Sequence, residues 1–311
     1  MKSSIVSSIL NRVHHPELFE ILSNQLSGTE LNSILLEVYS QRTQRMTPAD
    51  VLNLYQQNRF VKPTDLPVIE TKRMELEILE RFQEFSFEPL ELSPVSIQGS
   101  CSVIAPVDQK KILTALRGTE VLADSTNAIA LHVCDLKQKK GLPDIKRFCN
   151  IQRQIRTQAI SEKGFTPHFR IGCLVTCATD TGNFHFEKTA LNEHIQVMKD
   201  LFLDYYKVDE MSFRLLGRDG YPEGFLKKTG DHLRQMNPGI NILMNDKPEK
   251  EILYYRGIQY KVDILYKGKT YEIADGGFVD WTQRLLQNKK ERMLSTGFGF
   301  DLMLRILRGE I

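Results

Sequence analysis

The hydrophobic positions near the N-terminus recur at helical spacing. Leu31, Ile34 and Leu35 fall on one side of a helix, so that face can be buried. Thr47 is followed by a proline, and a hydroxyl N-cap with proline at the first helical position is a typical helix start. We therefore expect a helical N-terminal region over residues 1–62.

The helical pattern is interrupted between the N-terminal region and the rest of the chain. Pro63 and Pro67 lie four residues apart in a segment without apolar periodicity, and proline removes a backbone donor and resists helix continuation. We place a domain boundary there and expect a second domain over residues 68–311.

The second domain alternates between helical and strand-like patterns. Strand-like segments follow one another through short turns such as Lys267-Gly268-Lys269, and no regular βαβ alternation is present. The prediction is an α+β fold, with a mainly antiparallel sheet flanked by helices. The expected elements are a helix through Met74, Ile78, Phe82 and Phe85, a strand at Leu90 and Leu92, a helix from near Ser125, strands over 147–158 and 167–177, a helix over roughly 186–206, strands over 210–217, 251–266 and 269–277, a short strand around 295–300 and a final helix from Asp301.

Composition excludes several classes of protein. Hydrophobic residues make up 41% and charged residues 26%, as in ordinary soluble globular proteins, and a net charge of +2 argues against a dedicated nucleic-acid binder. The five cysteines form no Cys-x-x-Cys pair, so we expect no structural metal, no disulfide framework and a reducing cytoplasm. No apolar run reaches the ~20 residues that span a bilayer.

Some residues with chemical potential also have ordinary structural explanations. Glycines at strand ends let a backbone approach a ligand, but they are also the default residues of tight turns. Cys173 and Cys177 fit the interior of a strand better than a nucleophile's position. His185 and His194 lack a metal-binding pattern, so we expect surface or capping roles for them.

Three segments of the C-terminal third occur in an order that a known family shares. Together they resemble histidyl-tRNA synthetases and the related regulatory subunit of ATP phosphoribosyltransferase, which have a class II aminoacyl-tRNA synthetase core. The segments are the pair Tyr254-Tyr255, the stretch Ala274-Asp275-Gly276-Gly277-Phe278-Val279-Asp280, and Gly297-Phe298-Gly299-Phe300 before a terminal helix.

Earlier segments add to the resemblance, which covers roughly residues 68–311. The helix through Phe85 and the segment FEPLELSP after it, which contains Pro94, resemble motif 1. This motif forms the dimer interface in this family. Asp124 and Thr126 resemble the element that grips the amino group of the substrate. The stretch around Arg156 resembles motif 2, with Arg170 as the alternative arginine if the register differs.

The resemblance implies a site for an amino acid or small carboxylate and for ATP with Mg²⁺. An arginine suits this chemistry because its planar fork binds phosphate bidentately and keeps its charge. The implied substrate-binding residues are Asp124, Thr126, Tyr254, Tyr255, Gly276 and Gly277, and the implied nucleotide-binding residues are Arg156, Gln158, Phe169, Gly297, Gly299 and Arg305, with Arg156 also as the catalytic residue and Arg170 as its alternative.

The sequence departs from the family pattern where charge is expected. Gln158 replaces the glutamate of motif 2, and Leu304 replaces the arginine of motif 3, with Arg305 one residue late. A shift of one residue along a helix changes the direction of the side chain by about 100°, so Arg305 need not face the adenine. The segment 251–253 lacks the arginine that precedes the tyrosines, and 278–279 are apolar instead of polar. A pocket that has lost charge favours binding over activation.

Three functional hypotheses follow. The first is a regulator or sensor that binds an amino acid or nucleotide and controls a partner enzyme. The second is an enzyme that adenylates an amino acid or another carboxylate and transfers it to a non-standard acceptor. The third is a structural module without a ligand. A whole tRNA is not favoured as partner, because the sequence carries no recognisable anticodon-binding domain. A homodimer through the motif 1 region is expected from the resemblance.

Overall fold

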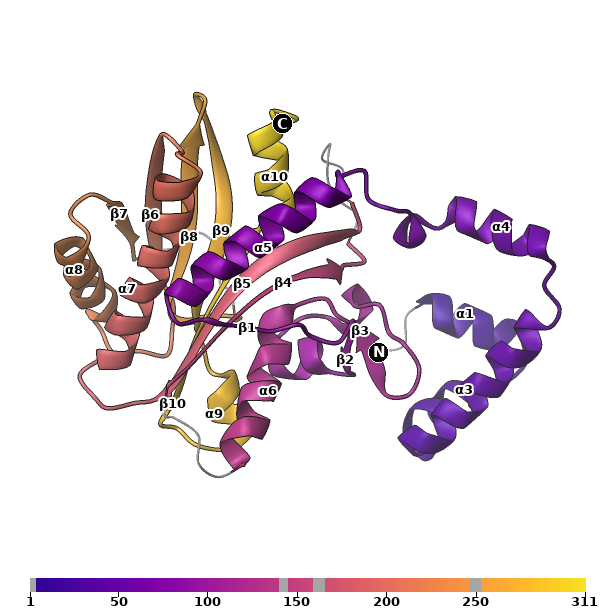
Figure 1. Ribbon diagram of the computed structural model, residues 1–311. Coiled ribbons are helices and arrows are strands. Elements are labelled where there is room, and N and C mark those ends of the chain that lie inside the picture. Colours follow the sequence, from indigo (N-terminus) through magenta and orange to yellow (C-terminus); the bar gives the residue numbers. More distant parts are fainter. Residues whose placement is uncertain (1–3, 140–144, 159–165, 247–252) are drawn as a thin grey trace. The chain divides into compact units, whose positions relative to one another are not determined.

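The computed structural model describes residues 4–139, 145–158, 166–246 and 253–311 (Figure 1). These residues form two compact units. The first consists of Met1–Lys62 with Thr114–Glu120, and the second of Pro63–Leu113 with Val121–Ile311. The loop 159–165, expected between two strands, lies outside the described residues.

The first unit is built from helices whose starts are fixed by side chains. Thr47 accepts a hydrogen bond from the backbone N–H of Asp50, whose carboxylate accepts one from the backbone of Thr47, so the predicted N-cap is confirmed. Ser27 and Glu30 form the same reciprocal arrangement. The elements are α1 (Ser4–Arg12), α2 (Leu18–Glu20), a π-helical turn (Ile21–Gln25), α3 (Gly28–Thr43), α4 (Pro48–Gln57) and a 3₁₀ turn (Arg59–Val61).

The second unit is organised around one eight-stranded sheet, in the order β1-β4-β5-β10-β9-β8-β6-β7. The end pairs β1–β4 and β6–β7 are parallel, and the pairs between them are antiparallel. The predicted α+β class is therefore confirmed. The strands are β1 (Glu88–Pro89), β4 (Lys146–Ile155), β5 (His168–Thr179), β6 (Glu210–Gly217), β7 (Asn241–Asn245), β8 (Arg256–Tyr266), β9 (Lys269–Val279) and β10 (Glu291–Gly299), with two short strands, β2 (Val95–Ile97) and β3 (Thr119–Val121), outside this sheet.

Local turn chemistry sets one hairpin, and two strand predictions differ from the structure. Lys267 and Gly268 have φ of 50° and 77°, which makes a tight turn between β8 and β9 as predicted. Strand β8 begins at Arg256, so the paired tyrosines precede the strand, and residues 251 and 252 of the expected strand lie outside the described residues. The strand expected at Leu92 is wrong: this segment is irregular, because the side chain of Gln152 supplies its hydrogen-bond partners.

Helices cover both faces of the sheet. Alternate strand residues point to opposite faces, so Leu174 and Phe298 join the core under α5, α7, α8 and α10. Cys173 and Met293 join a smaller core under α6 and α9. The helices are α5 (Val68–Glu84), α6 (Ser125–Gln138), α7 (His185–Lys199), α8 (Phe225–Met236), α9 (Trp281–Leu286) and α10 (Phe300–Arg308), with π-helical turns at Ser100–Ile104 and Asp200–Tyr205 and a 3₁₀ turn at Gln109–Lys111.

The surface role expected for His194 is wrong. Its side chain is 0% exposed, between the hydroxyl groups of Thr176 at 3.0 Å and Thr296 at 2.6 Å. Burial lowers the pKa of His194 to about 3, so the imidazole is neutral at physiological pH. The two threonines come from β5 and β10, far from His194 in the sequence, and helical spacing alone gave no sign of them.

All five cysteines are buried and none forms a disulfide bond. Burial raises the pKa of Cys149 to about 12 and of Cys134 to about 11, which keeps both thiols protonated. None of the described helices is long and apolar enough to cross a membrane.

Candidate functional site

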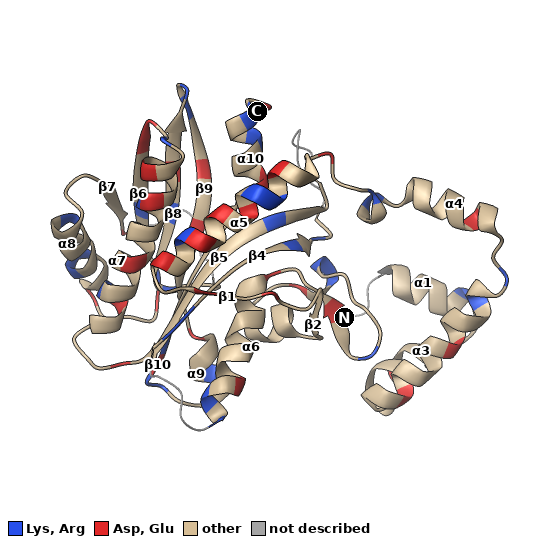
Figure 2. Ribbon diagram, in the orientation of Figure 1, with Lys and Arg blue, Asp and Glu red and all other residues tan. Residues whose placement is uncertain are grey.

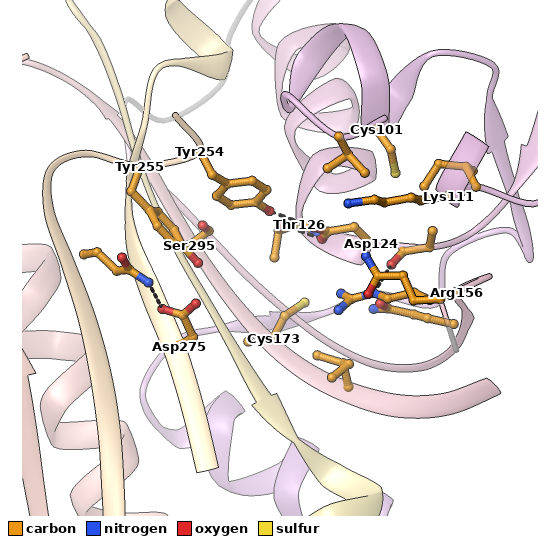
Figure 3. A pocket seen from close by; sticks show the side chains of 18 residues that line it. Cys101, Lys111, Asp124, Thr126, Arg156, Cys173, Tyr254, Tyr255, Asp275 and Ser295 are labelled. Carbon is orange, nitrogen blue, oxygen red and sulfur yellow. Dashed lines mark hydrogen bonds between the residues drawn. The ribbon is translucent and has the colours of Figure 1, made fainter. Parts of the chain in front are cut away.

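A cavity of about 410 Å³ opens on the α6 face of the sheet in the second unit (Figure 3). Its volume falls in the usual range of ~300–1,000 Å³ for ligand pockets. Strands β4, β5, β10, β9 and β8, which are neighbours in the sheet, contribute to it. The lining residues are Cys101, Val107, Lys111, Ile112, Ala123, Asp124, Thr126, Gln154, Arg156, Gln158, Ile171, Cys173, Tyr254, Tyr255, Gln259, Asp275, Ser295 and Gly297.

The floor of the pocket is hollow because its central position is glycine. Gly297 on β10 pairs with Cys173 on β5 and with Asp275 on β9, so these three residues form one row across the sheet. A Cβ at Gly297 would meet its nearest neighbour, Ile171, at 3.5 Å, which is ordinary contact. Protein packing therefore does not require glycine here, and its missing side chain leaves the space open to a ligand.

Asp124 presents a carboxylate at the start of α6. It is the N-cap of this helix: Oδ1 accepts hydrogen bonds from the backbone N–H of Thr126 at 2.8 Å and from its hydroxyl at 2.7 Å. The hydroxyl of Tyr254 donates to Oδ2 at 2.7 Å. A carboxylate offers about four acceptor positions, so these bonds leave one for an external donor such as an ammonium group.

The paired tyrosines form a wall with one polar end. Their rings meet edge-on with centroids 4.7 Å apart, and Tyr254 also packs edge-on against Trp281 at 5.1 Å. Burial, together with nearby carboxylates, raises the pKa of both phenols well above its ordinary value. Both hydroxyls therefore stay protonated and can act as donors.

Arg156 supplies a cation on another side of the pocket. It follows β4, and its Nε donates to the carbonyl of Ala123 at 3.2 Å. Its guanidinium carbon lies 5.5 Å from the centre of the Phe169 ring, so the aromatic face supports it. Within the described ranges no carboxylate forms an ion pair with Arg156. Lys111 adds a second, exposed cation to the lining.

A hydrogen-bonded chain of three side chains ends on a carboxylate in the pocket. Arg218, just after β6, donates through Nε to the side-chain amide oxygen of Gln259 at 3.0 Å. The amide nitrogen of Gln259 in turn donates to Oδ1 of Asp275 at 2.8 Å. Burial raises the pKa of Asp275 above its ordinary value, because desolvation disfavours the charged form.

The structure brings together seven of the residues expected in the site. Asp124 and Thr126 come from α6, Arg156 and Gln158 follow β4, and the tyrosine pair precedes β8. Gly297 forms the floor. They lie close together only because the sheet places these strand ends side by side.

Two expected arginines lie outside this pocket. Arg170 is nearly buried between Glu75 of α5 and Asp301 of α10, with nitrogen–oxygen distances of 3.6 Å to each. Arg305 forms ion pairs with Asp65 and Glu310. The one-residue displacement of Arg305 in the glycine-rich motif thus corresponds to a different direction of the side chain.

The other expected residues support the pocket without lining it. Phe169 lies under Arg156, and Gly299 is the N-cap of α10. Gly276 and Gly277 are required by packing, since a Cβ would lie 2.6 Å from the Tyr260 ring or from the carbonyl of Ile258, respectively.

Sequence reasoning missed several residues that the fold brings to the pocket. Lys111, Gln259, Asp275 and Ser295 line it, and none was expected there. A charged residue in the middle of the otherwise apolar stretch IADGGFV was the one signal that could have indicated Asp275. Lys111, Gln259 and Ser295 carry no comparable signal.

Adenylation in the implied family uses ATP with Mg²⁺, and the residues present fit only part of such a site. Arg156 and Lys111 can contact an anion, but Gln158 carries no charge and Arg305 is held by Asp65. In the part of the chain that the structure describes, no group of three histidines, cysteines or acidic residues could hold a metal ion.

Comparison with solved structures establishes the fold. The apo histidyl-tRNA synthetase of S. aureus has a TM-score of 0.59 at 12% identity, covering 80% of this chain and 69% of that one. An ATP phosphoribosyltransferase regulatory subunit/histidyl-tRNA synthetase from Bacillus halodurans C has a TM-score of 0.56 at 13% identity, covering 80% and 84%. A putative threonyl-tRNA synthetase, ThrRS-1 from Aeropyrum pernix, has a TM-score of 0.60 at 13% identity, covering 77% of this chain and 60% of that one.

The chain therefore has a class II synthetase-like fold, as predicted, while identities this low establish the fold alone. The chain spans less than two thirds of the Aeropyrum pernix protein. No family model matches the sequence. No curated protein matches it either.

Proposed function

We propose that the pocket binds an α-amino acid and that the chain acts as a regulator or sensor. One observation carries this proposal: Asp124, with an acceptor position to spare, and Arg156, without an ion-pair partner among the described residues, line the same cavity. A carboxylate suits the ammonium group of an amino acid, and a guanidinium suits its carboxylate.

The distribution of charge supports binding more than activation. Adenylation develops negative charge on the α-phosphate, which preorganised cations stabilise. Arg305, the arginine of the glycine-rich motif, is held by Asp65 and Glu310, and Gln158 is neutral. One of the similar solved structures is described as a regulatory subunit, which suggests a partner enzyme for this chain as well.

Thermal unfolding in the presence of single amino acids tests the proposal. A ligand that binds only the folded state stabilises it by ~2.7 kcal/mol at 100 times its Kd. We expect a rise in Tm with at least one amino acid. If no amino acid and no small carboxylate changes the Tm, the proposal is wrong.

Asp124→Asn is the sharpest variant, because asparagine is an equally good N-cap and keeps the start of α6. We expect at least ~10-fold weaker binding, since a hydrogen bond to a charged group contributes ~1.5–3 kcal/mol. Asp231→Asn, on the exposed side of α8, is the matched control and should bind normally.

An amino-acid adenylating enzyme with a non-standard acceptor is the second candidate. The observation in its favour is that two cations, Arg156 and Lys111, line the pocket, one more than an amino-acid carboxylate needs. ATP–pyrophosphate exchange with a panel of amino acids decides between them, because exchange with any of them would contradict a pure regulator. Arg156→Ala should abolish nucleotide binding, and unchanged binding would contradict the role of Arg156 in this pocket.

We further propose a homodimer through the region of α5. Figure 2 shows acidic and basic residues mixed along this helix. Between them Val68, Ile69 and Leu76 are 59%, 67% and 58% exposed, although apolar. Light scattering should give twice the mass of 35.8 kDa, and Leu76→Glu should shift the protein toward the monomer. A monomeric wild type at micromolar concentration would contradict this.

A further inference from the structure

Asp275 is a charged residue in the middle of a sheet. It lies on β9 between the buried residues Ala274 and Gly276. Its cross-strand neighbour on β10 is Gly297, on the pocket floor. Figure 3 shows Asp275 and Arg156 on opposite sides of the pocket. The cavity therefore has a second acidic position, separate from Asp124 and remote from the cations.

The surroundings of Asp275 orient its carboxylate without neutralising it. Arg218 holds the carbonyl oxygen of Gln259, so the amide nitrogen of Gln259 must face Asp275. Gln259 is 1% exposed, which makes this orientation rigid. An amide donates a hydrogen bond but brings no positive charge.

Nearby cations are committed to other partners. Lys261 is the cross-strand neighbour of Asp275, but its ammonium group pairs with Glu272 at 2.7 Å. The described parts of the chain contain no lysine, arginine or histidine in an ion pair with Asp275. Burial raises the pKa of Asp275, and the hydrogen bond from Gln259 and the charge of Lys261 only partly offset this.

We propose that the pocket selects an amino acid whose side chain ends in an ammonium or guanidinium group, with Asp275 as the partner of that cation. This inference rests on the proposed binding of an amino acid. Asp124 then receives the α-ammonium group, Arg156 the α-carboxylate, and Asp275 the distal cation, so each charge of a basic amino acid has an opposite charge in the lining.

Other side chains are rejected for electrostatic reasons. A neutral side chain would exclude water from Asp275, so the carboxyl group would either stay charged without a counterion or have to take up a proton, and both cost binding free energy. An acidic side chain would add direct repulsion. Gln259 restricts the choice further, because its amide nitrogen occupies one acceptor position of Asp275 and fixes the carboxylate plane.

Calorimetric titration with two pairs of matched ligands tests this. Lysine is compared with norleucine, which lacks the ammonium group, and arginine with citrulline, which has a neutral urea in place of the guanidinium. We expect at least one basic amino acid to bind ~30-fold or more tightly than its neutral partner, the difference typical of leaving a buried charge unpaired. Equal affinities within both pairs would overturn the proposal.

Two variants locate the selectivity. Asp275→Asn should remove most of the preference for the basic ligand while still binding citrulline or norleucine. Asp231→Asn, the same exchange at an exposed position of α8, is the control and should keep the wild-type preference. A preference retained in Asp275→Asn would overturn the assignment. The wild-type comparison stands by itself if Asp275→Asn does not fold.

The outcomes separate this inference from the function on which it rests. Tight binding of a neutral amino acid that depends on Asp124 would overturn the role of Asp275 and leave the amino-acid pocket in place. Absence of binding by every amino acid would overturn both. We expect that basic amino acids bind the wild type, bind Asp124→Asn at least ~10-fold more weakly, and bind Asp275→Asn without selectivity over their neutral partners.

Discussion

The two faces of the same strands differ sharply. On one face of β5, β10 and β8, Leu174, Phe298 and Tyr260 are almost completely buried among apolar side chains. One residue away along β5 and β10, Cys173 and Gly297 line the pocket on the other face of the sheet. Side chains alternate between faces in every strand, so a shift of one position separates the packed core from the ligand site.

This difference shows how the sheet combines stability with a hollow binding surface. Large side chains on the core face keep the strands in register, which allows small and polar residues on the other face. The contrast predicts that core-face substitutions change the free energy of unfolding and that pocket-face substitutions change binding.

The largest effect is expected from Phe298→Ala. Phe298 is 1% exposed and meets Phe82 and Phe202 edge-on at 6.0 and 6.2 Å. Its removal should lower the free energy of unfolding by about 3–5 kcal/mol, because it leaves a cavity as well as losing apolar burial. Urea denaturation measures this. A loss below ~1 kcal/mol would mean that the core face does not carry the stability.

The next effect is a dependence of stability on pH through His194. Its pKa is about 3 in the folded protein and ~6.5 when unfolded, so the unfolded state binds more protons between these values. The stability contribution is complete above pH ~6.5 and is lost as the pH falls toward ~3, by up to ~1.4 kcal/mol per pH unit. Urea denaturation from pH 7 to pH 5 should show this slope.

Two carboxyl groups oppose this slope at lower pH. Burial raises the pKa of Asp275 and of Asp301, so each binds its proton more tightly in the folded state and gives stability that is lost as the pH rises. The measurement is therefore the difference between wild type and His194→Gln, which cancels these groups. Equal slopes in both proteins would contradict the role of His194.

A smaller effect is expected from Gly276→Ala, which adds one methyl group to the core face. The new Cβ would lie 2.6 Å from the Tyr260 ring and 2.7 Å from the carbonyl of Ser295. Overpacking of this kind costs about 1–3 kcal/mol. Chemical denaturation should show this loss, and an unchanged midpoint would mean that the strands can separate locally.

The smallest effect on stability is expected from the matched substitution Gly297→Ala on the pocket face. The added Cβ makes only ordinary contacts, the nearest at 3.5 Å, so the free energy of unfolding should stay within ~1 kcal/mol of wild type. The methyl group enters the pocket floor, so ligand affinity should fall. Unchanged affinity with an identified ligand would show that the ligand does not reach this row.

Local patterns predicted much of the fold. The Thr47 N-cap, the helix from Ser125 and the turn at Lys267-Gly268 depend on interactions within a few residues, and the structure confirms each. The strand at Leu92 failed because its hydrogen bonds go to Gln152, 60 residues away.

The candidate site was predictable only where short motifs carry it. Asp124 with Thr126, the tyrosine pair and Gly297 belong to recognisable motifs and do line the pocket. Asp275 and Gln259 lie 16 residues apart, and their contact depends on the register between β8 and β9. No local pattern reports that register.

The sequence by itself determined several helix starts and the alternation of strand residues, which follow from backbone preferences and side-chain periods that act over a few residues. The class II synthetase-like fold was indicated by the resemblance of short motifs to a known family, and the solved structures confirm it. Only the tertiary structure decided that Arg305 pairs with Asp65, 240 residues away, and that Asp275 reaches the pocket. Such contacts join distant residues, and their free energy depends on burial that exists only after the strands have assembled.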